Sequence, residues 1–201
     1  MARNGTQKSI DRTREIHLTA AQIFSNKSFD STSLSDIADA LSITKAGLYY
    51  YVESKQDLLF QIMNLGLDSV KTEVLLPAQK IPDAEARLKF IVLNHARLVA
   101  GGNHAVVIIS DEISSLNFTQ REKILNRRRV YFDFVRDTLV QLEREGKLCE
   151  IDITTATFTL FGMILWLARW FRSSGKLSID KVCKDVCRMA LQGLLCAPQT
   201  I

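Results

Sequence analysis

Apolar residues recur at three- and four-residue spacing along almost the whole chain. This spacing is the period of an amphipathic helix, and no segment shows the clean two-residue alternation of a half-buried strand. Only three prolines occur among the 201 residues. The pattern therefore predicts an all-α protein with about nine helices.

Capping residues and breaks in the apolar pattern set the expected helix boundaries. A first helix ends near residues 28–30, and a second begins after Ser33, which can form a capping box with Asp36. A third helix follows from Thr44, and a long fourth helix should stop before Pro77. Five further helices are expected at residues 83–100, 104–114, 119–145, 154–172 and 178–195.

Connection lengths indicate two domains. The first three helices are joined by very short links, so they form a compact N-terminal group, whereas Pro77 and Pro82 mark a break further along the chain. We therefore expect an N-terminal domain over residues 1–55 and a C-terminal domain over residues 56–201, linked by the long fourth helix.

Three consecutive tyrosines stand in the segment SITKAGLYYYVESKQDLL, residues 42–59. A helical wheel over residues 45–53 places four residues on an inner side: Gly47, Leu48, Tyr51 and Val52. The outer side holds Lys45, Ala46, Tyr49, Tyr50 and Glu53. A small residue allows close approach to a DNA groove, and phenols and an ammonium group can reach phosphates or base edges. Together with the very short link before it, this face predicts a helix-turn-helix that binds DNA.

Further groups near this segment can bind phosphates. The helix starts at Ser33, Thr44 and Ser54 present backbone N–H donors, and Lys55 can bind one more phosphate. The chain also begins with a basic arm suited to the DNA backbone or minor groove: Arg3, Lys8, Arg12 and Arg14. Ordinary solvated charge remains the alternative for this arm.

The segment FDSTSLSDIADALSITKAGLYYYVESKQDLL, residues 29–59, resembles the helix-turn-helix signature of the TetR family (TetR/AcrR) of bacterial transcription regulators. The resemblance implies a homodimer on a palindromic operator, with a C-terminal ligand-binding domain whose last two helices form the dimer interface. Carried over by position and combined with the groups above, the predicted DNA-binding residues are Ser33, Ser35, Thr44, Lys45, Ala46, Gly47, Tyr49, Tyr50, Tyr51, Lys55, Arg3 and Arg12. Tyr51 is either a core residue or a phosphate contact.

Two residues depart from the pattern of the family. Ser42 replaces the usual turn glycine, and Val52 replaces a common phenylalanine. Because serine adopts a positive φ less readily than glycine, the geometry of this turn is less certain from the sequence.

A second segment, FGMILWLARWFR at residues 161–172, places Trp166 and Trp170 one turn apart beside Arg169. The tryptophans are either core or dimer-interface anchors, or the wall of a pocket for a large amphipathic anion. On fewer residues, the segment resembles TetR-family regulators of lipid and steroid catabolism, some of which respond to acyl-CoA thioesters. The predicted ligand-binding residues are Leu88, Ile91, His95, Tyr131, Phe134, Trp166, Arg169 and Trp170. Most of them are also explained as bundle core, and His95 as a buried, hydrogen-bonded histidine.

Composition narrows the remaining functions. A net charge of +4 permits a polyanionic partner. The N-terminus lacks a secretory signal, and the apolar stretch at residues 158–171 looks too short for a membrane span, so a cytoplasmic protein without membrane contact is expected. The four cysteines show no C-x-x-C pair and are expected to be structural thiols. No metal, cofactor or enzymatic activity is expected, because no nucleophile elbow, phosphate loop or metal motif occurs.

These patterns favour a ligand-responsive transcriptional repressor that binds operator DNA as a homodimer, with an acyl-CoA or another bulky, lipid-like molecule as effector. The alternative is a DNA-binding interaction or scaffold protein, or an activator, that has no small-molecule effector.

Overall fold

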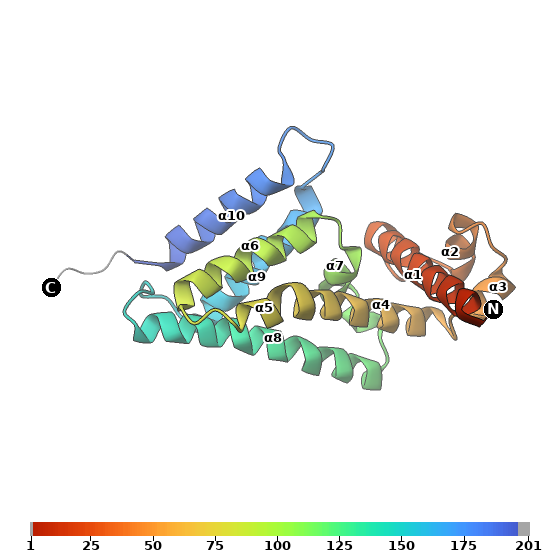
Figure 1. The fold of residues 1–201 in the computed structure, drawn as a ribbon, viewed down its shortest axis with the longest axis horizontal. Helices are drawn as coiled ribbons and strands as arrows, with labels where there is room; N and C mark the ends of the chain where they lie inside the picture. The colour runs from red at the N-terminus through yellow and green to blue at the C-terminus, as the bar shows by residue number, and fades with distance from the viewer. Residues whose placement is uncertain (1, 197–201) are drawn as a thin grey trace. The chain divides into compact units, whose positions relative to one another are not determined.

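The computed structural model describes residues 2–196, with side chains described from residue 11 onward. These residues form helices and connecting turns (Figure 1), and within them no strand occurs beyond one isolated bridge between Leu148 and Leu195. The main helices are α1 (Ala2–Lys27), α2 (Leu34–Ala40), α3 (Lys45–Tyr49), α4 (Lys55–Val70), α6 (Ala84–Ala100), α7 (His104–Asp111), α8 (Phe118–Arg144), α9 (Ile153–Trp170) and α10 (Ile179–Leu194). The predicted all-α fold is confirmed.

The chain packs as two compact units. The first runs to Leu67 and includes His104–Leu125, and the second holds Asp68–Asn103 and the chain from Asn126 onward. By packing, α7 therefore belongs with the N-terminal helices and lies against α1. The boundary at residue 55 stays a prediction. A fully buried apolar core joins the helices of the first unit: Ile16, Phe24, Ile37, Leu48, Leu58, Ile62, Ile108 and Ile124.

The second unit is built around α6, which packs against α9 and α10. Asp83 caps α6, since its carboxylate accepts a hydrogen bond from the Ala86 N–H at 2.7 Å. Arg87 ties α6 to α8, because its guanidinium donates to the Thr138 hydroxyl at 3.1 Å and to the Gln141 side-chain carbonyl. These contacts fix the helix that carries Leu88, Ile91 and His95.

The linking helix does not stop before Pro77, contrary to the prediction. After α4 the backbone widens into a π-helix (Lys71–Leu75), in which the Leu76 N–H donates to the Lys71 carbonyl five residues earlier. A short α5 (Leu76–Ala78) follows, with Pro77 in its first turn. Proline is tolerated in a first helical turn because the N–H that it lacks would have no helical partner there. The widened turn therefore lets the helix run on.

Ser42 forms the turn between α2 and α3 with a φ of 54°, so the turn needs the left-handed conformation that favours glycine. We expect Ser42→Gly to raise the free energy of unfolding by about 0.5–1 kcal/mol, because it removes a left-handed strain that slightly exceeds the entropy cost of glycine. Urea unfolding followed by circular dichroism measures this change. Ser42→Ala, which keeps the strain, should show no gain; an equal gain from both substitutions would contradict the argument.

Candidate nucleic-acid interface and effector region

The start of α2 is fixed by the predicted capping box. The Ser33 hydroxyl accepts a hydrogen bond from the Asp36 N–H at 3.1 Å, and the Asp36 carboxylate accepts one from the Ser33 N–H at 2.7 Å. The hydrogen bonds from Ser33 hold the pKa of the Asp36 carboxyl below its usual value. Thr44 caps α3 in a similar way, since its hydroxyl accepts from the Gly47 N–H at 3.0 Å. The two helices of the motif thus begin at defined residues, and they pack against each other.

The exposed and buried sides of residues 45–52 follow the helical wheel, although α3 itself ends at Tyr49, and Tyr50 and Tyr51 form the turn after it. Leu48 and Val52 are buried against the core of the first unit, whereas Tyr49 is 50% exposed and Tyr50 81% exposed. Lys45 and Ala46 are exposed on the same outer side, and Gly47 is half-buried. The helix and the turn residue directly after it therefore present a lysine, an alanine and two phenols to the outside.

Tyr51 takes an intermediate position. It is half-buried and packs against the core of the first unit, and its ring lies edge-on to that of Tyr50, with centroids 5.0 Å apart. Tyr51 thus helps to seat α3 and supports the exposed ring of Tyr50. Whether its hydroxyl also reaches a phosphate stays open as a prediction.

A shallow hollow of about 440 Å³ lies beside the start of α2. Its lining includes Ser33, Lys45, Tyr49 and Lys55. The Lys55 ammonium donates to the carbonyls of Phe29 at 2.9 Å and Thr32 at 2.8 Å, and it lies 4.1 Å above the centroid of the Phe29 ring. Since an ammonium has three N–H donors, one remains for a phosphate. Lys55 therefore holds the turn before α2, and its contact with a phosphate stays a prediction.

The basic N-terminal segment forms the first turns of α1. The backbone of α1 begins at Ala2, and the side chain of Arg3 lies outside the described residues. Arg12 donates to the Leu41 carbonyl at 3.1 Å and pairs with Glu15 at 2.5 Å. Arg12 therefore fastens α1 to the end of α2. Ser35, another predicted DNA-binding residue, lies half-buried on α2.

The residues predicted to bind a ligand fall into two groups in the second unit. Leu88, Ile91, His95 and Tyr131 are buried. The Tyr131 hydroxyl lies 3.3 Å from His95 Nδ1, and the Phe161 ring stands edge-on to both rings, with centroids 5.9 Å and 5.6 Å away. The expectation of a buried, hydrogen-bonded His95 is confirmed. Phe134 is half-buried beneath the guanidinium of Arg87.

The second group lies on the outer side of α9. Trp166 is 65% exposed and Trp170 47% exposed, and Arg169 is exposed beside them. The structure therefore does not bring the tryptophans together with His95 and Tyr131. Phe158, also exposed, extends the same apolar stripe.

By length and composition, α9 is long and apolar enough to cross a membrane. The helix predicted at residues 154–172 agrees with α9 within two residues at each end, and the apolar stretch at residues 158–171 covers only part of it. Its inner side belongs to the bundle, since Ala156, Leu160 and Leu167 are buried. An apolar helix with one buried side is also what an interface between subunits requires.

Two features were missed in the sequence. Phe161 lies three residues before the buried Ile164, and this spacing was the signal in the sequence for its place on the inner side of α9.

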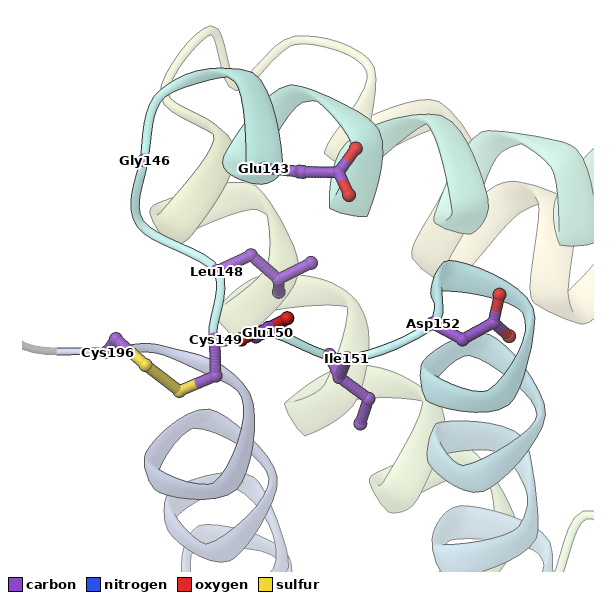
Figure 2. A pocket seen from close by; sticks show the side chains of 8 residues that line it. All are labelled: Glu143, Gly146, Leu148, Cys149, Glu150, Ile151, Asp152 and Cys196. Carbon is purple, nitrogen blue, oxygen red and sulfur yellow. A yellow bond between two sulfur atoms is a disulfide. The ribbon is translucent and has the colours of Figure 1, made fainter.

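The second feature concerns the cysteines. The expectation of four free thiols is wrong, because Cys149 and Cys196 form a disulfide (Figure 2). A separation of 47 residues gives no local pattern from which to predict this pair. Cys183 and Cys187 are free and buried. Within the described part of the chain, no cluster of three or more His, Cys, Asp or Glu could hold a metal ion.

Burial lowers the pKa of His95 to about 4, from a usual value of 6.5. Between these values the unfolded chain binds a proton that the folded chain does not, so stability falls as the pH falls. We expect the free energy of unfolding to drop by about 2 kcal/mol between pH 7.5 and pH 5 from this residue alone. Urea unfolding across this range measures the drop.

The matched variant for this prediction is His95→Leu combined with Tyr131→Phe, which removes both hydrogen-bonding partners together. It should show a shallower pH dependence than the original protein. Burial also lowers the pKa of His104, so part of the pH dependence should remain in the variant. Identical pH profiles for the two proteins would show that His95 does not titrate as inferred.

Comparisons with known proteins agree with this architecture. Residues 16–62 match the family model described as "Bacterial regulatory proteins, tetR family", and residues 82–194 match "Tetracyclin repressor-like, C-terminal domain". The "HTH-type transcriptional repressor KstR2" of Rhodococcus jostii strain RHA1 is 27% identical over 192 residues, which cover 94% of each protein.

Two solved structures extend the comparison. The crystal structure of AibR in complex with isovaleryl coenzyme A and operator DNA is 32% identical, with a TM-score of 0.80, and the match covers 89% of this chain and 97% of that chain. The ketosteroid transcriptional regulator KstR2 of Mycobacterium tuberculosis, 22% identical, has a TM-score of 0.85 over 92% of this chain and 96% of that chain, and it shows the fold alone. Since the second family model alone matches more than half of the residues, the chain belongs to the TetR family of bacterial DNA-binding regulators.

Proposed function

We propose that this protein is a ligand-responsive transcriptional repressor that binds a palindromic operator as a homodimer. The outer face of α3 carries the proposal, because it exposes Lys45, Ala46, Tyr49 and Tyr50 while Leu48 anchors the helix in the core. A tyrosine side chain that is at least half exposed contributes little to the stability of the fold. Its phenol is available to contact a phosphate or a base edge of DNA. The face suits the major groove of DNA.

The supporting contacts follow from the geometry of the motif. Ser33, at the start of α2, and Thr44, at the start of α3, are exposed, so the first N–H groups of both helices can approach phosphates. Ser35, Gly47, Tyr51, Lys55 and Arg12 lie half-buried around them and complete the proposed interface. Phosphate contacts of this kind orient the protein, and the α3 side chains then read the sequence.

Fluorescence anisotropy with fragments of the DNA upstream of the gene for this protein tests the proposal. We expect tight binding to one fragment, with an affinity that falls steeply with added salt because each phosphate contact releases a counterion. A scrambled fragment of equal length is the control. Equal affinity for both fragments, or binding that does not respond to salt, would count against operator recognition.

We propose that the dimer forms through α9 and α10. The exposed apolar stripe of α9 contains Phe158, Trp166 and Trp170, and α10 adds Met189, which is 63% exposed. A Cβ added at Gly162 or at Gly193 would meet nothing within 4 Å in the single chain, so a second subunit can approach both helices closely. The exposed tryptophans and the unobstructed glycines on this side of α9 and α10 support a helix-to-helix interface between two subunits.

Trp166→Ala tests this interface. Buried interface tryptophans often contribute 2 kcal/mol or more, so we expect the dissociation constant of the dimer to rise by about thirtyfold or more. Sedimentation velocity measures the change. Leu177→Ala is the control, since Leu177 is a comparably exposed apolar residue in the turn before α10. An unchanged dimer in Trp166→Ala would place the interface elsewhere.

We propose an acyl-CoA or a similarly bulky amphipathic molecule as the effector. The support is the likeness to AibR, which crystallised with isovaleryl coenzyme A and operator DNA. Addition of acyl-CoA thioesters of increasing chain length to the operator complex tests this. An effector of this kind should change the operator affinity by about 5- to 150-fold, whereas free coenzyme A serves as the control.

A regulator without a small-molecule effector is the second candidate. The observation that favours it is the close packing of His95, Tyr131 and Phe161, which fill the space between their helices with ring contacts. An effector that binds at the predicted residues His95 and Tyr131 would have to displace some of these contacts. If no acyl thioester raises the melting temperature or changes operator affinity, this second candidate replaces the first.

A further inference from the structure

The end of α10 is attached to the loop between α8 and α9 by a small, well-defined junction. The Cys149 N–H donates to the Leu194 carbonyl at 2.8 Å, and the Cys196 N–H donates to the Lys147 carbonyl at 3.1 Å. These two hydrogen bonds form the antiparallel bridge between Leu148 and Leu195. The disulfide between Cys149 and Cys196 closes the same junction, with Cα atoms 5.0 Å apart (Figure 2).

The junction makes the disulfide reversible in principle. The backbone hydrogen bonds do not involve sulfur, so they can keep the two cysteines close when the bond is reduced. Cys149 is half-buried and Cys196 exposed, so small reagents can reach the pair. A DNA-binding regulator works beside the chromosome, in a compartment whose thiol pool is reducing, and disulfides there are typically transient. A permanent structural role does not fit that setting.

We propose that Cys149 and Cys196 form a reversible redox pair, in which oxidation by a hydroperoxide fastens the end of α10 to the α8–α9 loop and reduction releases it. One thiolate attacks a peroxide oxygen, the O–O bond breaks, and a sulfenic acid forms. The second thiol attacks this sulfur, the S–S bond forms and water leaves. Two electrons pass from the two thiols to each hydrogen peroxide, which yields two waters. A dithiol reductant returns both electrons.

The other two cysteines serve as an internal reference. Cys183 and Cys187 are buried in α10, and burial raises the pKa of both thiols. Since the thiolate is the reactive form, they should remain reduced while the pair reacts. The described chain thus contains one accessible pair, which joins the α8–α9 loop to the segment after α10, and two protected thiols within α10 itself.

The approach to the disulfide selects reagents by charge. A hollow of about 530 Å³ beside it is lined by three carboxylates, those of Glu143, Glu150 and Asp152 (Figure 2). Asp152 stays ionised, because hydrogen bonds from Thr155 lower the pKa of its carboxyl. Lys147, two residues before Cys149 in the chain, pairs with Glu145 at 2.8 Å. Neutral hydrogen peroxide and cationic disulfides should therefore reach the pair more readily than the anionic disulfide of glutathione.

The first test compares the full-length protein in two states, reduced with a phosphine and then treated with hydrogen peroxide. We expect oxidation to lower the intact mass by two hydrogens and to leave two of the four thiols titratable after unfolding. Hydrogen exchange at residues 190–196 should slow, and the melting temperature should rise by about 5–10 °C because the bond closes a segment of 47 residues. Dithiothreitol should reverse all these changes in the folded protein.

Substitutions of single cysteines test which thiols react with peroxide. In Cys149→Ser, peroxide should leave a sulfenic acid on Cys196 that dimedone traps, and the exchange rate at residues 190–196 should no longer respond to oxidation. Cys183→Ala should keep the full response. At low salt, cystamine should oxidise the reduced protein about tenfold faster than glutathione disulfide, and the difference should shrink at high salt.

Three outcomes would overturn the proposal. The pair could fail to oxidise, the bond could resist dithiothreitol in the folded protein, or oxidation could leave exchange at the end of α10 unchanged. None of these readouts uses operator DNA or an effector. Their failure is therefore distinct from a failure of the proposed repressor function.

Discussion

The double substitution Lys45→Ala and Tyr49→Ala is expected to weaken operator binding by about thirtyfold or more, without unfolding the protein. Each contact to a base or phosphate in the groove contributes about 1–3 kcal/mol, and a tenfold change in affinity corresponds to about 1.4 kcal/mol. Both side chains lie on the outer face of α3, so their truncation removes little packing. Changes at such exposed positions usually alter stability by no more than about 0.5 kcal/mol.

The two single variants separate the roles of these side chains. Lys45→Ala should reduce the slope of log affinity against log salt by about one if Lys45 neutralises a phosphate, and it should relax sequence preference if Lys45 reads a base. Lys80→Ala is the matched control, because Lys80 is an exposed lysine of the second unit. If the double variant bound the operator as tightly as the control, α3 would not be the recognition helix.

Local chemistry made much of the DNA-reading motif predictable. The Ser33 cap and the inner and outer faces of α3 each follow from residues within one or two turns of each other, whereas the positive φ of Ser42 was not predictable because serine stands where the family usually has glycine. Helical periodicity and capping act over such short ranges, so a single sequence contains the information. Tyr51 is different: its half-buried position depends on packing against the rest of the first unit, so local rules do not decide between its two predicted roles.

Features that depend on distant parts of the chain could not be predicted in this way. The sequence gives no local signal that Cys149 meets Cys196, or that Lys55 reaches back to the carbonyls of Phe29 and Thr32. The predicted ligand set failed to separate the buried His95 from the exposed Trp166 because both lie in amphipathic helices whose partners were unknown. Helical periodicity identifies a buried side but not what covers the other side.

Gly66 shows how such a long-range contact can outweigh local preference. It lies in α4, where replacement of glycine by alanine normally stabilises a helix by about 1 kcal/mol. At this position, however, a Cβ would lie 2.4 Å from the Ala105 carbonyl oxygen and 2.6 Å from its carbon. These are backbone atoms of α7, so no side-chain rotation can relieve the overlap.

We therefore expect Gly66→Ala to lower the free energy of unfolding by about 3 kcal/mol, because α4 and α7 must separate within the first unit and the apolar contacts around them are lost. Urea unfolding measures the loss, and hydrogen exchange should show faster exchange in α7. Gly162→Ala is the control, since an added Cβ there meets nothing within 4 Å of the same chain. Below the concentration at which the protein dimerises, that control should gain stability. A stable Gly66→Ala would mean that α4 and α7 do not pack as closely as their backbones indicate, and helix propensity would then decide the sign.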